Sequence, residues 1–345
     1  MNIGFLSSYG SLNEGNKLFT DINSSIGDNL LLPFVMLGNK AKSNGIILRT
    51  VTDDNINEYD AYVLVDIPNQ EDSLTSAVIA SDKDKFLLLL ESKHIMPKGY
   101  DVNFHRKFKK VFTWDESLLE LDKERYIKIN YAHLLPINIK KNILERKKKL
   151  VMITGNKMSN DEFELYTKRK DIIDYYDSHA QERLDLYGIG WNLRCFKSKI
   201  LSSIAHRVPV IKSFGYTSPK SYKGIIERKK PVLEEYMFSI CFENRYGDRG
   251  YITEKIFDAM LAGCIPIYLG AIDIELHIPN NCYIDMREFN NLTDLDSYLF
   301  SMPDTTIVKY QDNISQFLST EASFLFSITH FVDTILSNIC KKYEA

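Results

Sequence analysis

The amino-acid sequence predicts an α/β protein built from two Rossmann-like domains, and three observations support this prediction. Short apolar runs alternate with helical segments over residues 2–135. Residues 237–271 read as a complete strand–helix–strand unit of the kind found in parallel sheets. The length of 345 residues suits two domains of ~150 residues each. We therefore expect an N-terminal domain over residues 1–140, a C-terminal domain over 150–330 and a final helix over 331–345.

The first domain is predicted from a series of short strands that end in polar residues. Strands are expected at residues 3–7, 46–51, 61–67, 86–90 and 110–114, with a helix over 30–43. Glu91 and Asp115 directly follow the last two of these strands. In a parallel sheet, ligands bind beyond the carboxyl ends of the strands. Glu91 is therefore a candidate catalytic residue, with Asp115 as the substitute; alternatively, Glu91 caps the turn that follows it.

Residues 237–271 organise the second domain. The run 237–242 is almost wholly apolar, as expected of a strand that is buried on both faces of its sheet. A polar loop with two glycines follows, and Thr253 is predicted to cap a helix that Gly263 ends. The start of that helix offers N–H groups and partial positive charge to a phosphate, and Lys255 adds a full positive charge.

The rest of the second half also alternates strands and helices. Strands are expected at residues 150–154, 184–187 and 264–269, and helices at 161–179, 291–302, 307–318 and 324–340. The basic segment 140–149 is predicted to connect the domains and to form a solvated helix face. Contact with an anionic membrane surface is the alternative for this segment.

The composition is that of an ordinary globular enzyme, with 44% hydrophobic and 26% charged residues. The net charge of -3 gives no reason to expect a nucleic-acid partner. Several of the scattered cysteines lie in apolar runs, which indicates reduced core residues: Cys195, Cys241, Cys264, Cys282 and Cys340. The sequence has no Cys/His cluster that suggests a metal site, and no apolar run approaches the ~20 residues needed to span a bilayer.

A long motif in the central stretch resembles a family signature. It consists of F-E-N at 242–244, Y-I-T-E-K at 251–255, D-A at 258–259 and G-C-I-P-I-Y-L-G at 263–270. This pattern resembles the signature of the α1,3/4-fucosyltransferases, glycosyltransferase family 10, of the soluble bacterial or viral type. Two shorter patterns are also similar to the family: E-S-K at 91–93, with Lys93 where the family has Pro, and a helix containing Arg169 that precedes L-Y-G-I-G-W.

The resemblance implies a GT-B architecture, in which two Rossmann-like domains face each other across a cleft. It implies an inverting transfer of L-fucose from GDP-fucose, with Glu91 as the catalytic base. Arg169 and Lys255 would meet the diphosphate, although Arg169 could instead be a solvent-facing helix residue. Asn244, Tyr251 and Glu254 would contact the ribose, phosphate and fucose hydroxyls. The resemblance implies no cofactor and no essential divalent metal, because protein cations would neutralise the leaving group.

The expected partners are GDP-fucose and an oligosaccharide or glycolipid acceptor, such as lipopolysaccharide, with an α1,3-type linkage. Animal members of the family carry a membrane anchor that this sequence lacks, so we expect a cytoplasmic enzyme with at most peripheral contact at the inner face of the membrane. Two alternatives stay open. The same fold could use another GDP-sugar, such as GDP-arabinose or GDP-L-galactose, or the protein could bind a GDP-sugar with weak catalysis or none.

Overall fold

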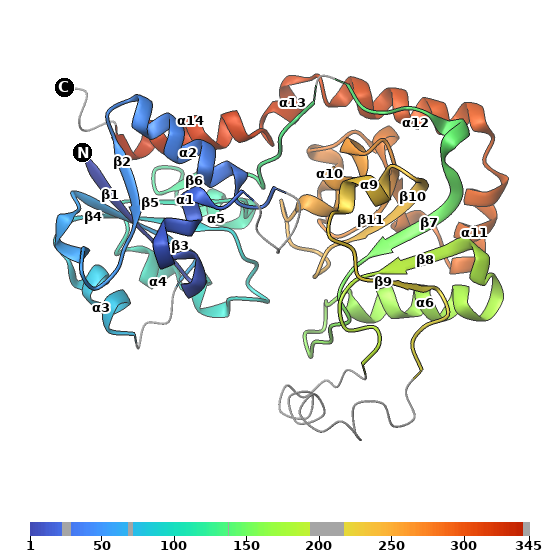
Figure 1. Cartoon of the computed structure of the whole chain (residues 1–345), viewed down its shortest axis with the longest axis horizontal. Helices are drawn as coiled ribbons and strands as arrows, with labels where there is room; N and C mark the ends of the chain where they lie inside the picture. The colour runs from blue at the N-terminus through green and yellow to red at the C-terminus, as the bar shows by residue number, and fades with distance from the viewer. Residues whose placement is uncertain (23–28, 68–71, 137, 194–216, 341–345) are drawn as a thin grey trace. The chain divides into compact units, whose positions relative to one another are not determined.

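The computed structural model describes residues 1–22, 29–67, 72–136, 138–193 and 217–340 (Figure 1). The chain divides into two compact units. Unit 1 contains Met1–Leu135, the short segment Arg249–Tyr251 and the chain from Glu321 onward. Unit 2 contains Pro136–Asp248 and Ile252–Thr320. The chain therefore enters unit 1 three times, and the final helix, which the sequence predicts as a separate segment, is part of unit 1.

Unit 1 is built on a parallel sheet, which has six strands within the described residues. The strands are β1 (Asn2–Ser7), β2 (Ile47–Thr50), β3 (Ala61–Val65), β4 (Asp84–Leu89), β5 (Lys110–Thr113) and β6 (Tyr126–Lys128). Their order is β2-β1-β3-β4-β5-β6, and all pairs are parallel. The order reverses at β1 and β3, which is where open α/β sheets bind ligands.

The helices of unit 1 come from the N-terminal 135 residues and from the C-terminal part of the chain. They are α1 (Lys17–Thr20), α2 (Leu32–Ser43), α3 (Ser73–Ala80), α4 (Val102–His105), α5 (Glu116–Leu121), α13 (Glu321–Phe324) and α14 (Ile328–Cys340). The rings of Phe34 in α2 and Phe331 in α14 meet edge to face at 5.9 Å between centroids. Helix α14 shares one apolar core with β1, β3 and α2, so the C-terminal helix covers the N-terminal sheet.

Unit 2 is built on a second parallel sheet, again with six strands within the part of the chain that the structure describes. The strands are β7 (Lys147–Ile153), β8 (Leu184–Tyr187), β9 (Tyr222–Gly224), β10 (Tyr236–Phe242), β11 (Ile265–Leu269) and β12 (Ile284–Asp285). Their order is β12-β11-β10-β7-β8-β9. This is the doubly wound Rossmann order, and it reverses between β7 and β10. Every residue of β10 is buried, as its apolar run predicts.

The helices of unit 2 are α6 (Tyr166–His179), α9 (Lys229–Leu233), α10 (Glu254–Leu261), α11 (Leu292–Ser301) and α12 (Asp304–Phe317). Helix α6 connects β7 to β8, whereas α10 connects β10 to β11 in the opposite direction across the sheet. Because such crossovers are right-handed, α6 and α10 cover opposite faces. In Figure 1 they lie on either side of the strands. The two helices therefore approach the ends of β7 and β10 from both faces.

Short 3₁₀ helices make up many of the connections. They are Gly10–Leu12, Glu14–Asn16, Ile56–Glu58, Pro97–Tyr100, Ile143–Glu145, Gln181–Arg183, Ile274–Leu276, Asn280–Cys282 and Met286–Glu288. Helix α6 begins at Tyr166, five residues after the predicted start at 161. Residues just before it pair with the loop after β10 through the bridge between Glu164 and Arg245. That pairing keeps residues 161–165 out of the helix.

The prediction that the basic segment 140–149 forms a solvated helix face is wrong. The segment holds a 3₁₀ helix over Ile143–Glu145 and then starts β7 at Lys147. Arg146 is buried and donates to the carbonyl oxygens of Tyr236 at 2.9 Å and Lys140 at 2.9 Å. Each lysine of the segment also has an oxygen partner within unit 2: Lys140 with Glu145, Lys141 with Asp312, Lys147 with Glu235, Lys148 with the Met302 carbonyl and Lys149 with Asp185.

The cysteines that the structure describes are free thiols in the core, as predicted: Cys241, Cys264, Cys282 and Cys340. Burial raises the pKa of Cys264 to about 12 and that of Cys282 to about 12, so both thiols are protonated at neutral pH. Cys195 lies outside the described residues. Burial also raises the pKa of Cys241, so Cys241, Cys264 and Cys282 are packing residues rather than nucleophiles.

Candidate active site

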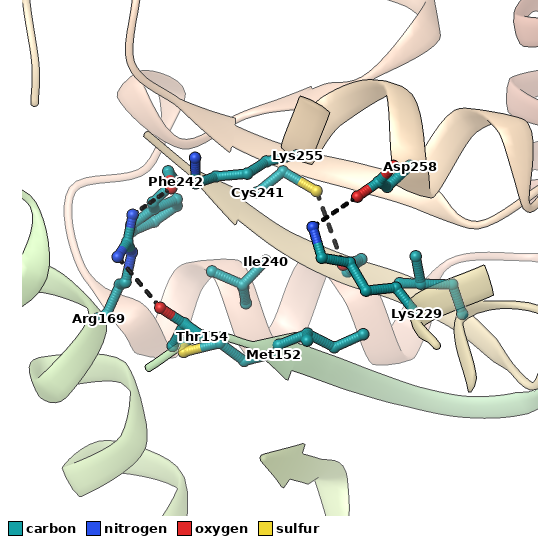
Figure 2. A pocket seen from close by; sticks show the side chains of 12 residues that line it. Met152, Thr154, Arg169, Lys229, Ile240, Cys241, Phe242, Lys255 and Asp258 are labelled. Atoms are coloured by element: carbon teal, nitrogen blue, oxygen red, sulfur yellow. Dashed lines mark hydrogen bonds and ion pairs between the residues drawn. The ribbon is translucent and has the colours of Figure 1, made fainter. Parts of the chain in front are cut away.

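A pocket lies beside the ends of β7 and β10, where the strand order of unit 2 reverses. Its lining residues come from β7, α6, α9, β10 and α10: Met152, Ile153, Thr154, Arg169, Lys229, Leu233, Ser239, Ile240, Cys241, Phe242, Lys255 and Asp258. Figure 2 shows Arg169 on one side of the pocket, Lys229 with Asp258 on the other, and Ile240 between them. The pocket thus joins an apolar floor to basic side chains from three helices.

Arg169 is buried and points at the end of β10. Its guanidinium donates to the carbonyl oxygens of Phe242 at 2.6 Å and Glu243 at 2.7 Å. It also reaches Asn244 Oδ1 at 3.2 Å and, on β7, Thr154 Oγ1 at 3.1 Å. With 4% of its surface exposed, Arg169 is not a solvent-facing helix residue, so that alternative is wrong. The structure therefore places this cation where the two central strands, β7 and β10, end.

Glu243 is a site residue to which the sequence analysis assigns no role. Its side chain is fully buried and lies against the start of α10. The carboxylate accepts from the Thr253 backbone N–H at 2.8 Å, from the Thr253 hydroxyl at 2.6 Å and from Lys255 Nζ at 3.1 Å. Thr253 is the N-cap residue of α10, as predicted, but its hydroxyl makes no capping hydrogen bond and donates to Glu243 instead. The sequence feature that could have indicated Glu243 is its position as a single acidic residue directly after the apolar run 237–242.

Lys255 is held in its charged form by two carboxylates. Its ammonium lies 3.1 Å from Glu243 and 3.6 Å from Glu254. Burial lowers the pKa of Lys255, but the two carboxylates outweigh it, and the net shift is upward. The ammonium also donates to the Thr253 hydroxyl at 2.9 Å. The Lys255 charge therefore has a fixed position at the helix start, as a phosphate site requires.

Lys229 extends this network to the far side of the pocket. It lies 2.8 Å from Asp258 and 3.6 Å from Glu254. Burial opposes its charge, but Glu254 and Asp258 raise the pKa of Lys229 above its ordinary value. Glu254 therefore lies between two lysines, and both ammonium groups are charged at neutral pH. Asp258, which belongs to the D-A part of the motif, holds Lys229 in place.

The loop after β10 is fixed by the residues that precede α6. The Asn244 carbonyl accepts from Leu165 N–H at 3.0 Å, and Tyr246 N–H donates to the Phe163 carbonyl at 2.8 Å. Arg245 forms ion pairs with Asp161, at 3.3 Å, and with Asp248. Asn244 is thus fixed at two points: its backbone carbonyl bonds to Leu165, and its side-chain oxygen bonds to Arg169. The structure brings Arg169, Asn244, Glu254 and Lys255 together in unit 2.

Tyr251 lies in unit 1, whereas the other donor candidates lie in unit 2. Its ring is 2% exposed and packs on Trp114, with 4.8 Å between ring centroids, and on Tyr131 at 6.3 Å. Gly250 precedes it with φ of 77°, and a Cβ there would lie 2.4 Å from the Trp114 carbonyl oxygen. Only glycine fits this approach. Arg249 forms an ion pair with Glu120, also in unit 1.

Glu91 lies two residues after the end of β4 in unit 1, close to the strand end as predicted, and its side chain is partly exposed. Its Oε1 accepts a hydrogen bond of 2.6 Å from the Tyr9 hydroxyl, and Tyr9 follows β1. Asp115, the substitute candidate, caps α5 by accepting from Ser117 N–H at 2.8 Å. Burial raises the pKa of Asp115, but its carboxylate already has a structural role. The ends of β1 and β4 thus present Glu91 together with Tyr9, which the sequence analysis does not single out.

Within the described residues, no group of three or more His, Cys, Asp or Glu side chains is arranged to hold a metal ion. Among the helices described, none is both long and apolar enough to cross a bilayer.

Comparisons with known proteins connect these residues to one family. A model of the C-terminal part of glycosyltransferase family 10 (fucosyltransferase) matches residues 145–343, which is more than half of the chain. An alpha-(1,3)-fucosyltransferase, FucT, of Helicobacter pylori is 34% identical over 74 residues, covering 21% of this chain and 15% of that protein. The mouse 4-galactosyl-N-acetylglucosaminide 3-alpha-L-fucosyltransferase 9 is 37% identical over 129 residues, covering 36% and 34%. The matches thus span about a third or less of each relative.

Solved structures show the same fold over nearly the whole chain. A crystal structure of an alpha1,3-fucosyltransferase matches with a TM-score of 0.53 and 15% identity, covering 98% of this chain and 89% of that one. The Anabaena protein HepE in complex with UDP and glucose matches with a TM-score of 0.55 and 11% identity, covering 99% and 100%. The predicted class, α/β with two Rossmann-like domains of the GT-B type, is confirmed by these likenesses and by the two parallel sheets.

Proposed function

The chain belongs to glycosyltransferase family 10, and we propose that it transfers L-fucose from GDP-fucose to a hydroxyl group of an acceptor glycan. One observation carries this proposal: Arg169, Asn244 and Lys255 meet around buried Glu243 at the strand ends of unit 2. All of these residues lie within the region that matches the family model. The curated relatives are fucosyltransferases by name, and one of the solved neighbours holds GDP-fucose.

Donor binding would use the fixed cations of unit 2. The diphosphate of GDP-fucose gains negative charge as the bond to fucose breaks, and cations that are already in place stabilise that charge without reorganising. Arg169 offers a planar donor group for phosphate oxygens, and Lys255 adds a point charge at the start of α10. Asn244 and Glu254 supply acceptors for sugar hydroxyls beside these cations. Tyr251, from the segment that packs in unit 1, is the remaining donor contact that we propose.

The transfer itself would invert the configuration at C1 of fucose in a single displacement. Glu91 would take the proton from the acceptor hydroxyl as its oxygen attacks C1, while the bond from C1 to the diphosphate breaks and GDP leaves. The position of Glu91 at a strand end and its hydrogen bond to Tyr9 support this role. Arg169 and Lys255 would neutralise the leaving group, so we propose that no divalent metal is essential.

The acceptor would be an oligosaccharide or a glycolipid, and an α1,3-type linkage follows the names of the relatives. The basic segment 140–149 gives no support to contact with a membrane, because its side chains have partners inside unit 2. A different GDP-sugar remains the second candidate, since the contacts described here recognise diphosphate and hydroxyl groups rather than the C5 substituent.

The test is a mass-spectrometric screen of oligosaccharide acceptors with GDP-fucose, GDP-arabinose and GDP-L-galactose, with GDP release measured in parallel. The expected result is one acceptor that gains a single deoxyhexose, with GDP formed in equal amount. Arg169→Ala should abolish most of this transfer, whereas Lys168→Ala, on the exposed side of α6, should not. Binding of GDP-fucose without any product would favour the catalytically inactive alternative.

A further inference from the structure

The backbone around Glu91 is held by side chains rather than by a neighbouring strand. Asp66, directly after β3, accepts from the N–H groups of Leu90 at 2.8 Å and Glu91 at 2.9 Å through the same oxygen, Oδ1. Strand β4 ends at Leu89, so within the described residues no neighbouring strand offers carbonyl acceptors to the N–H groups of Leu90 and Glu91. The Asp66 carboxylate therefore fixes the two consecutive N–H groups of Leu90 and Glu91, the candidate base.

The carbonyl groups of the same two residues are fixed by aromatic side chains. Trp114 Nε1 donates to the Leu90 carbonyl oxygen at 2.7 Å, and the Tyr131 hydroxyl donates to it at 2.6 Å. The Tyr100 hydroxyl donates to the Glu91 carbonyl oxygen at 2.9 Å. All four backbone polar groups of the Leu90–Glu91 pair are thus bonded to side chains of unit 1. The Glu91 carboxylate projects from a backbone that has little freedom to turn.

Asp66 takes this position at a cost to stability. Its φ of 56° lies in the left-handed region, which residues other than glycine adopt infrequently, although aspartate and asparagine adopt it more readily than most. It is 2% exposed, and burial raises the pKa of its carboxyl group to about 7. Its N–H donates to the Leu88 carbonyl at 2.7 Å, which locks it between β3 and β4. Strained, buried polar residues that persist are concentrated at functional sites.

The Glu91 side chain is fixed as well. The Tyr9 hydroxyl donates to its Oε1 at 2.6 Å. Burial and the nearby Glu91 raise the pKa of Tyr9, so this phenol stays protonated and keeps donating at neutral pH. Tyr9, Asp66 and Glu91 follow β1, β3 and β4, which are neighbours at the reversal of strand order in unit 1. The three residues therefore occupy the place where this kind of sheet binds ligands.

We propose that Asp66 is a positioning residue, which holds the Leu90–Glu91 backbone so that the Glu91 carboxylate meets the acceptor hydroxyl, and that Tyr9 orients that carboxylate. This inference rests on the proposed role of Glu91 as the base. Asp66 itself touches no reacting atom. Its effect is geometric, and a misplacement of ~1 Å at a reacting group can cost ~10²-fold in rate.

The test compares two substitutions of Asp66. Glycine accepts the left-handed φ without strain, so Asp66→Gly removes the carboxylate and leaves the backbone conformation available. Asparagine also tolerates that conformation and keeps Oδ1, so Asp66→Asn retains the acceptor for both N–H groups. We expect Asp66→Gly to lower kcat by ~10- to ~100-fold with the KM for GDP-fucose unchanged, and Asp66→Asn to restore most of kcat. Equal losses in both variants would contradict the hydrogen-bond account.

Two further measurements keep this inference separate from the proposed function. Glu91→Gln is assayed alongside: if it loses turnover while Asp66→Gly keeps it, the inference on Asp66 fails and the base stands. If Glu91→Gln turns over normally, the base assignment itself fails. Should Asp66→Gly not fold, as judged by its circular dichroism spectrum and melting temperature, Tyr9→Phe provides the second variant. It should lower kcat with an unchanged KM for GDP-fucose, and a normal kcat would overturn the orienting role.

Discussion

The two sheets of this protein present functional groups at the same topological position but by different means. In unit 2, the ends of β7 and β10 hold charged side chains that are paired with one another around buried Glu243. In unit 1, the ends of β1, β3 and β4 hold a single partly exposed carboxylate, Glu91, on a backbone fixed by neutral hydrogen-bond donors and by Asp66. The first arrangement suits binding of an anion, and the second suits transfer of a proton.

Under the proposed function, the two sheets would divide the reaction, with fixed charges in unit 2 and a fixed backbone geometry in unit 1. Preorganised cations stabilise developing negative charge best when their positions do not change during the reaction. A general base needs a defined position but also a carboxylate that can accept a proton. Substitutions in unit 2 should therefore weaken donor binding, whereas substitutions in unit 1 should slow the chemical step.

The largest effect is expected for Glu91→Gln. Glutamine keeps the size of the side chain and the acceptor for Tyr9 but cannot take a proton. General-base catalysis contributes roughly 10²- to 10⁴-fold, so kcat should fall by that factor in a steady-state assay of GDP release. Glu124→Gln, at an exposed carboxylate of the same unit, is the matched control. Normal turnover of Glu91→Gln would remove Glu91 from the mechanism and direct attention to Asp115.

Lys255→Ala should have the next largest effect. The loss of one fixed cation at a developing charge costs ~10²-fold or more, here in kcat/KM for GDP-fucose. Lys168→Ala serves as the control, because Lys168 is an exposed lysine of the same unit. If Lys255→Ala retained full activity, its ammonium would serve only as the partner of Glu243.

Glu243→Gln tests the anchor of the unit 2 cluster. The amide keeps the shape of the side chain but loses its charge, so Lys255 and the start of α10 lose a charge-assisted acceptor. Such bonds are worth ~1.5–3 kcal/mol, and we expect a lower melting temperature together with ~10-fold weaker binding of GDP-fucose. Calorimetry on the purified variant measures both. Unchanged stability and binding would show that the cluster does not depend on this carboxylate.

Asp66→Asn gives a smaller, pH-dependent effect on stability. The pKa of Asp66 in the folded protein is raised to about 7 from its ordinary value of 3.8. The folded state therefore binds a proton more tightly than the unfolded state, and stability is lost as the pH rises from about 4 through about 7. Asparagine does not ionise, so Asp66→Asn should gain melting temperature relative to the natural protein at pH 8 but not at pH 4. An equal difference at both pH values would contradict the shifted pKa.

The smallest effect is expected from chelation. If Arg169 and Lys255 neutralise the diphosphate, activity should be largely retained in EDTA, as measured by GDP release. A complete loss that manganese restores would show that a metal performs this task.

The sequence predicted much of the fold because periodic apolar runs report directly on burial. The strand over residues 184–187 was recovered in this way, whereas Arg169 was indicated by the family resemblance and not by an apolar pattern. Contacts between residues far apart in the chain produce no periodic pattern in the sequence, so they could not be predicted in this way. Nothing local indicates that the Thr253 hydroxyl donates to Glu243, or that Tyr251 packs on Trp114 in unit 1. Asp66 was also missed, because its left-handed conformation and its bonds across 24 and 25 residues depend on the completed sheet.

We propose that unit 2 binds the donor while Glu91 of unit 1 performs the proton transfer. Calorimetric titration of GDP-fucose into Lys255→Ala and Glu91→Gln, beside the natural protein, tests it most directly. The account predicts that Lys255→Ala weakens binding by ~10-fold or more, whereas Glu91→Gln binds GDP-fucose as the natural protein does. Normal binding by Lys255→Ala, or an equal loss in both variants, would contradict this division of roles.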